Sequence, residues 1–134
     1  MLRLAPEVHR KVVGHCYDGL PDEACGLLAG PPGTGKASEV YLARNAAASA
    51  RVYEVDGRDY LRADRDAEAR GLEIMGVFHS HTHTEAYPSP TDVAQAPDPS
   101  WHYVVVSLKD LPVVRSFRIV DGNIAEEPVV LDGK

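Results

Sequence analysis

Several features that would place this chain in a common functional class are absent or scarce. Only two cysteines occur, Cys16 and Cys25, too few for a disulfide framework or a cysteine-based zinc site. No apolar run is long enough to cross a bilayer, and residues 1–6 lack a signal-peptide core. The net charge is −6 and basic residues do not cluster, which argues against a nucleic-acid surface. We therefore expect a soluble cytoplasmic protein that binds neither membrane nor nucleic acid and keeps both cysteines reduced.

Three catalytic signatures are missing as well. The glycine-rich segment 30–35 lacks the Lys-Ser/Thr ending of a phosphate-binding loop, so we interpret it as a turn. No Cys-x-x-Cys pair is present, which argues against a zinc deaminase. The helical His-Glu-x-x-His signature of another class of zinc peptidase is absent too.

The residues that are present predict one α/β domain. The chain has 134 residues, of which 44% are apolar and 25% charged, as in an ordinary globular domain. Apolar spacing predicts a helix from Pro6 to about Tyr17. Asp56 can cap a second helix from Gly57 to about Arg70, whose many charges indicate a largely solvated face. Strands are predicted at 24–28, 39–43, 51–55, 74–78, 103–108 and 113–120, with a hairpin turn at 121–123 and a strand from 124. We expect a mixed central sheet flanked by helices, in a single domain over residues 1–134.

The segment from 79 to 92 carries candidate metal ligands. Residues two apart on a strand face the same side, so His79 and His81 would leave the strand together and converge on one ion. Ser89 and Asp92 have the spacing of a helix start, which would hold the carboxylate rigidly. Two imidazoles and a carboxylate suit a catalytic zinc, which keeps its fourth position open. Spacing alone does not decide between the pair His79/His81 and the pair His81/His83.

Hydrolysis by a zinc-activated water also needs a group that accepts a proton. Glu23, just before the predicted strand at 24–28, is one candidate. The periodicity does not distinguish it from Glu39 or Glu54.

Taken together, these residues resemble the JAMM (MPN+) zinc metallopeptidases. The family pattern is a distant Glu, then His-Ser/Thr-His, seven residues, Ser, two residues and Asp. This chain reproduces it with Glu23, His79-Ser80-His81, Ser89 and Asp92. The resemblance implies a Jab/MPN (cytidine-deaminase-like) fold.

The same resemblance implies a role for each matching residue. Zn²⁺ would be held by His79, His81 and Asp92. Glu23 would be the general base and then the proton donor to the leaving amine. The Ser89 hydroxyl would help to stabilise the oxyanion. This role is compatible with helix capping, because the oxygen can accept a helix N–H while the proton is donated to the oxyanion.

Further segments look like a bacterial branch of the family, the Mec type. They are His79–Thr82, Thr84–Ser89, His102–Val104, Arg118–Gly122 and Glu126–Val129. That branch removes cysteine from the C-terminus of a ubiquitin-like sulfur carrier of the CysO type, in cysteine biosynthesis. The resemblance thus implies a carrier partner with a glycine-rich C-terminal tail.

Two alternatives remain open, a JAMM peptidase acting on another ubiquitin-like tail and a non-catalytic MPN scaffold. Scaffold members lose metal ligands, whereas this chain retains the full set. Three arginines, Arg44, Arg51 and Arg58, are candidates for contact with the carboxylate of the released cysteine. We interpret Trp101 and His102 as structural. The sequence leaves the oligomeric state open, with a homodimer as one option.

Overall fold

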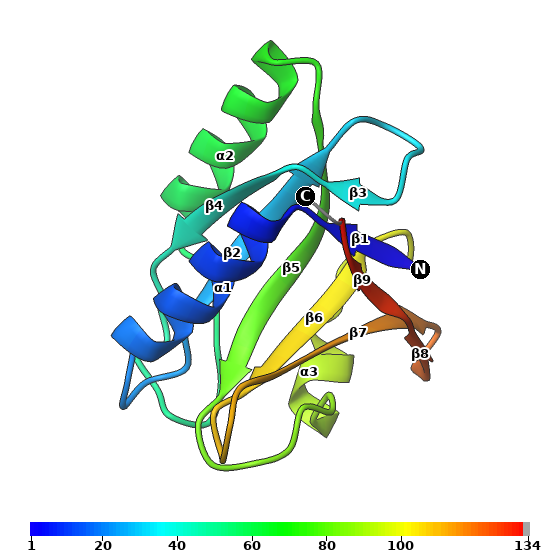
Figure 1. Cartoon of the computed structure of the whole chain (residues 1–134). Helices are drawn as coiled ribbons and strands as arrows, with labels where there is room; N and C mark the ends of the chain where they lie inside the picture. The colour runs from blue at the N-terminus through cyan, green and yellow to red at the C-terminus, as the bar shows by residue number, and fades with distance from the viewer. Residues whose placement is uncertain (133–134) are drawn as a thin grey trace.

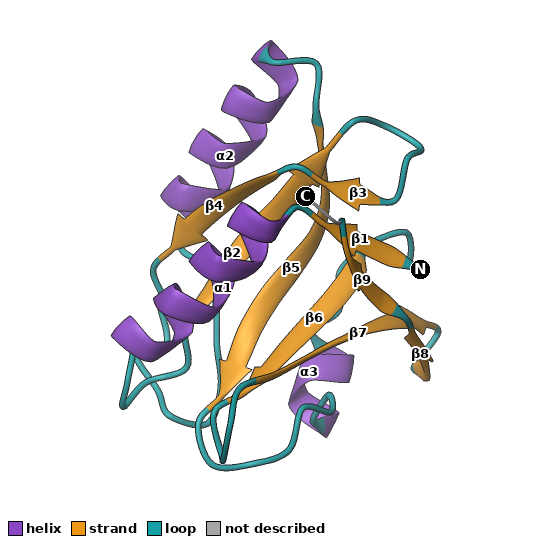
Figure 2. Cartoon of the chain, viewed as in Figure 1, coloured by secondary structure: helices purple, strands orange, loops and turns teal. Residues whose placement is uncertain are grey.

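The computed structural model describes residues 1–132 and has a mixed sheet flanked by helices (Figures 1 and 2). The α/β class predicted from the sequence is therefore confirmed. In chain order the elements are β1 (Leu2–Leu4), α1 (Pro6–Asp18), β2 (Cys25–Gly30), β3 (Lys36–Ala37), β4 (Glu39–Ala43), α2 (Gly57–Ala69), β5 (Glu73–His81), α3 (Pro90–Ala94), β6 (His102–Ser107), β7 (Val113–Val120), β8 (Asn123–Glu127) and β9 (Val129–Leu131).

The main sheet has six strands in the order β4-β2-β5-β6-β7-β8. Only β5 and β6 are parallel, and the other neighbours are antiparallel. β7 and β8 form the expected hairpin, since Val120 pairs with Asn123 across Asp121 and Gly122, both at positive φ as a primed turn requires. β5 lies in the middle of the sheet, so the His-Ser-His segment forms the C-terminal end of a central strand.

Both faces of the main sheet are covered. On one face, α1 and β1 bury apolar side chains against the sheet, among them Val12, Leu28 and Phe78. On the other, Leu27 and Val77 pack with Ala63 and Ala67 of α2 buried nearby. Neighbouring residues of one strand thus point into opposite cores, which explains why β2 and β5 are apolar along most of their length.

The two long helices begin and end where local chemistry predicts. Pro6 occupies the first turn of α1. The Asp56 carboxylate accepts hydrogen bonds from the N–H groups of Arg58 and Asp59 and so caps α2. Gly71 follows α2 at φ +72, a conformation that glycine adopts without strain. None of the helices in residues 1–132 is long and apolar enough to cross a membrane.

The structure departs from the sequence predictions in two places. Residues 51–55 do not form a strand, and only Val55 makes an isolated bridge, to Asn45. The physical reason is that the Asn45 side chain takes up the Val52 carbonyl and the Glu54 N–H, groups that a neighbouring strand would otherwise pair. In addition, β1, β3 and β9 form a small parallel sheet. The sequence did not predict it, because strands of two or three residues are too short to show an alternating pattern.

Candidate metal centre

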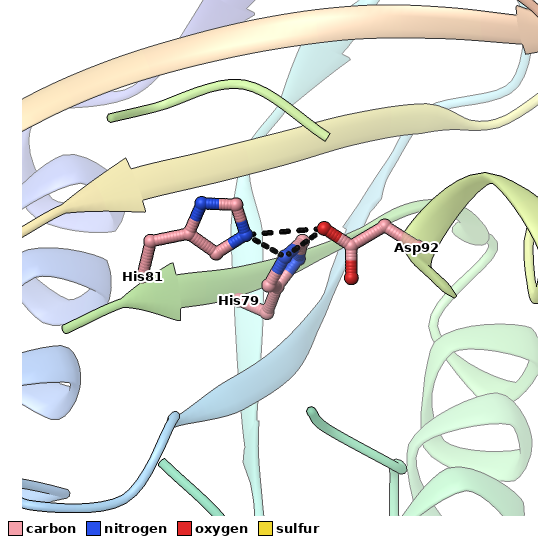
Figure 3. A group of neighbouring side chains, drawn as sticks. All are labelled: His79, His81 and Asp92. Atoms are coloured by element: carbon pink, nitrogen blue, oxygen red, sulfur yellow. Dashed lines mark hydrogen bonds and ion pairs between the residues drawn. The ribbon is translucent and has the colours of Figure 1, made fainter. Parts of the chain in front are cut away.

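Three side chains converge where β5 ends and α3 begins. His79 and His81 leave β5 on the same side, and Asp92 reaches toward them from the first turn of α3 (Figure 3). All three are buried, with at most 6% of each residue exposed. The strand ends at His81 and His83 is exposed beyond it, so the structure brings together the pair His79/His81.

The spacing of the three ligand atoms fits a tetrahedral ion. His79 Nε2 and His81 Nε2 lie 3.1 Å apart, and they lie 3.0 and 3.1 Å from Asp92 Oδ2. A zinc ion with bonds of 2.0–2.1 Å and tetrahedral angles would separate its ligand atoms by about 3.3 Å. Three polar atoms at nearly that spacing, in a buried position, have the donor chemistry and the geometry of a zinc site.

Surrounding hydrogen bonds orient two of these ligands. His81 Nδ1–H donates to the Glu85 carbonyl over 2.8 Å, so Nε2 of the neutral ring keeps its lone pair for the shared centre. Ser89 N–H donates to Asp92 Oδ2, while Asp92 N–H donates to Ser89 Oγ, a reciprocal capping box. The loop and the helix start therefore fix the orientation of the His81 and Asp92 side chains without an ion.

Burial and mutual contact shift the pKa values of these three groups in different directions. Burial lowers the pKa of His79, which favours the neutral imidazole. Burial acts in the same direction on His81, but contacts with Asp92 and the Glu85 carbonyl outweigh it and raise its pKa. Burial opposes ionisation of Asp92, yet the two imidazoles hold its pKa well below the usual range. Asp92 is thus a carboxylate at neutral pH.

Glu23 reaches this centre through long-range strand pairing. β2 and β5 are antiparallel with Cys25 opposite His79, and continuing that register by two residues places Glu23 opposite His81. Ser80 extends the pairing, because its N–H donates to the Ala24 carbonyl and its Oγ accepts from the Ala24 N–H. Glu23 is only 4% exposed although it precedes the strand.

The Glu23 carboxylate has the electrostatic character of a proton acceptor at neutral pH. Burial raises its pKa to about 7, with His81 lowering it and Asp92 raising it by smaller amounts. Its Oε1 atom is buried and has no protein hydrogen-bond partner. A bound cation would lower this pKa again and favour the carboxylate. Neither Glu39, which forms an ion pair with Arg70, nor the exposed Glu54 has such an environment.

Sequence reasoning missed two residues that organise the centre. The Tyr53 ring stacks on His79, with centroids 4.1 Å apart and planes 15° apart. The Asn45 amide binds the groups on either side of Tyr53 and also the Glu23 carbonyl. The only local signals were an Asn after a strand and an aromatic residue in an apparent strand, and neither pattern indicates proximity to a metal.

Other candidates lie elsewhere. Arg44 forms ion pairs with Asp56 and Asp59, away from the triad. His102 is buried and its Nδ1 lies 2.6 Å from a Glu127 carboxylate oxygen, which fits the structural role we expected for it.

Comparison with known proteins is consistent with this geometry. Residues 5–120 match the family described as prokaryotic homologs of the JAB domain. A CysO-cysteine peptidase of Mycobacterium tuberculosis is 41% identical over 131 residues, covering 96% of this chain and 90% of that protein. A desampylase of Haloferax volcanii is 31% identical, covering 79% of this chain and 80% of that protein.

Solved structures share the fold. A solution structure of a protein from Desulfitobacterium hafniense superposes with a TM-score of 0.92 at 34% identity, covering all of this chain and 94% of the other. A structure described as JAMM, a metalloprotease-like zinc site in the proteasome and signalosome, superposes with a TM-score of 0.60 at 15% identity, covering 97% of this chain and 98% of the other. At that identity the second likeness concerns the fold alone.

Proposed function

Because the chain belongs to the prokaryotic JAB-domain family of JAMM proteins, we propose that it hydrolyses the amide bond between a ubiquitin-like sulfur carrier and a C-terminal cysteine, releasing cysteine. That the chain is a peptidase follows from its family and from its likeness to a named CysO-cysteine peptidase. The substrate is a proposal, supported by 41% identity to a CysO-cysteine peptidase over nearly the whole of both chains. It would place the protein in cysteine biosynthesis.

The observation that carries the proposed chemistry is the convergence of His79, His81 and Asp92 beside a buried Glu23. We assign the first three residues as the groups that hold zinc. Zinc, when bound, lowers the pKa of a coordinated water toward 7 and polarises a carbonyl. Three protein ligands would leave a bound zinc able to accept water or substrate as well.

Glu23 and Ser89 would supply the remaining chemistry. Glu23 accepts a proton from the attacking water and returns it to the leaving amine, a task that suits a carboxylate with a pKa near neutrality. Ser89 Oγ accepts the Asp92 N–H, so its own proton is available to a carbonyl oxygen in the cleft it shares with His81. A substrate tail rich in glycine would let the backbone approach these groups closely.

We propose that residues 1–134 form one domain. The family match covers 5–120, and β9 extends the fold by pairing with β1. The last two residues lie outside the described part of the chain.

The alternative substrate is another ubiquitin-like tail, joined to a lysine of a second protein. Likeness to a desampylase at 31% identity favours this alternative over a scaffold, because that relative is also named for an activity. The two substrates differ in the group that leaves, which makes them separable by experiment.

Mass spectrometry of a carrier–cysteine adduct incubated with the zinc-loaded protein tests the proposal. We expect the carrier to lose one cysteine, and a chelator to prevent that loss. The matched arm uses the same carrier joined through an isopeptide bond to lysine. An intact carrier–cysteine adduct together with cleavage of the isopeptide would refute the cysteine-releasing function and favour the alternative.

A further inference from the structure

A cleft of about 430 Å³ opens beside the metal centre and contains one lysine. Its lining includes His81, Ser89, Tyr87 and Lys109. The cleft therefore reaches from a metal ligand and the Ser89 hydroxyl to an exposed ammonium group. The carbonyl of the cleaved bond must lie at the metal centre. Substrate groups next to that bond must therefore lie in a cleft that adjoins the centre, as this one does.

The backbone holds Lys109 close to His81. The strands β5 and β6 pair His81 with Ser107, and Leu108 N–H donates to the His81 carbonyl over 3.0 Å. Ser107 Oγ then accepts the Lys109 N–H and donates to the Thr84 carbonyl. The position of Lys109 relative to the centre is thus set by the same two strands that present the ligands.

The Lys109 ammonium has no carboxylate partner among residues 1–132. It makes no ion pair with Glu85, which lines the same cleft. Lys109 also lines an adjacent cavity, whose other cation, Arg115, pairs with Glu126 at 3.5 Å. His83 also lines the cleft, but an imidazole is charged only when protonated. Lys109 is therefore the permanent positive charge of this cleft, in a protein whose net charge is −6.

We propose that Lys109 is a specificity-determining residue that binds the free α-carboxylate of the leaving amino acid. This inference rests on the proposed function, in which a single C-terminal residue is released. The carboxylate of such a residue follows the cut bond by only one residue, at most about 3.6 Å along the chain. An ammonium on a flexible stem in the same cleft can meet it. The isopeptide substrate has no carboxylate at that position.

This assignment replaces the three arginines suggested by the sequence. Arg44 is paired with Asp56 and Asp59, and neither Arg51 nor Arg58 lines the cleft that contains His81. Arg51 is exposed and lies in the loop that follows β4, which makes it a matched control for Lys109.

The test uses a ubiquitin-like carrier that ends in Gly-Gly-Cys, prepared as the free acid and as the C-terminal carboxamide. For the zinc-loaded wild-type protein we expect kcat/KM to be about tenfold higher for the acid, the size of one charge-assisted hydrogen bond. Lys109→Gln should lose that preference by slowing cleavage of the acid and leaving the amide unchanged. Arg51→Gln should keep it. Equal losses on both carriers would show that Lys109 contacts another part of the carrier, and would overturn the proposal.

A binding measurement separates this inference from the proposed function. Calorimetry with the zinc-loaded Glu23→Ala variant compares the affinities of the two carriers without turnover. The measurement is repeated with the double variant that also carries Lys109→Gln. If the wild-type protein cleaves neither carrier, the proposed function fails, while a Lys109-dependent preference for the acid in binding would still support the inference. If the two carriers bind equally well, or if neither binds, the inference about Lys109 is wrong.

Discussion

Asn45 Nδ2 donates a hydrogen bond to the backbone carbonyl of Glu23, with 2.9 Å between the two atoms. The same amide nitrogen donates to the Val52 carbonyl, and the amide oxygen accepts from the Glu54 N–H. One side chain therefore links the candidate base to both neighbours of Tyr53, the ring that stacks on His79. The loop between β4 and α2 and the segment before β2 are fixed relative to each other at this residue.

Asn45→Ala should reduce turnover without removing the metal. We expect kcat to fall about tenfold because Glu23 and Tyr53 lose a shared support, and the free energy of unfolding to fall by about 1–3 kcal/mol from polar groups left without partners. Zinc content should stay near that of the wild type, since β5 and α3 carry the proposed ligands. Kinetics, metal analysis and denaturant unfolding check this. Loss of zinc in the variant would contradict it.

Glu23→Ala should separate catalysis from metal binding. We expect zinc to be retained and turnover to fall by about 10²–10⁴-fold, the usual contribution of a general acid–base group. His79→Ala and Asp92→Ala should lose both zinc and activity. Glu54→Ala is the matched control, because that glutamate is exposed and should be replaceable without effect. Normal rates for Glu23→Ala would show that another group accepts the proton.

The raised pKa of Glu23 predicts how the stability of the metal-free protein depends on pH. The folded protein has a pKa of about 7 at this group against 4.5 ordinarily, so between these values it binds more protons than the unfolded chain. Its contribution to stability therefore decreases as pH rises through this window. Glu23→Gln should accordingly be more stable than the wild type by about 1–2 kcal/mol above pH 7, allowing for partial solvent screening, with no difference below about pH 4.5.

Chemical denaturation across pH, with and without zinc, checks this dependence. Added zinc should shrink the advantage of Glu23→Gln, because a nearby cation favours the carboxylate form. Glu54→Gln should show neither effect. A stability difference between Glu23→Gln and the wild type that does not vary with pH would mean that burial does not control this carboxyl group.

Ser89 combines two roles that two substitutions can separate. Its oxygen caps α3, and replacement by Ala should cost about 1 kcal/mol of stability, whereas Gly at a cap costs only a few tenths. Both variants lack the hydroxyl proton, so both should lose turnover by about 10²–10³-fold. Ser89→Thr keeps the hydroxyl and should be affected least. If Ser89→Gly is fully active, the hydroxyl only caps the helix.

Much of the fold was predictable because its signals are local. The helix at Pro6, the Asp56 cap, the apolar strand entering His79 and the turn at Asp121 each depend on neighbouring residues. The false strand at 51–55 shows the limit of such signals. Its alternation was correct for a strand, but a side-chain amide occupied the backbone groups that a strand would pair.

Local spacing indicated a metal site, but it did not choose between the pairs His79/His81 and His81/His83, and the resemblance to a family pattern made that choice. A period of two aligned His79 with His81, and a capped helix start presented Asp92, since both features lie within a few residues of chain. Glu23 is different, because its placement depends on a strand pairing between segments more than fifty residues apart. Packing of the two cores and the hydrogen bonds of Ser80 and Asn45 hold that register, and with it the burial that raises the pKa of Glu23. Tertiary contacts likewise decided that Tyr53, Asn45 and Lys109 lie near the metal centre. A single sequence carries no information on distances between residues so far apart in the chain.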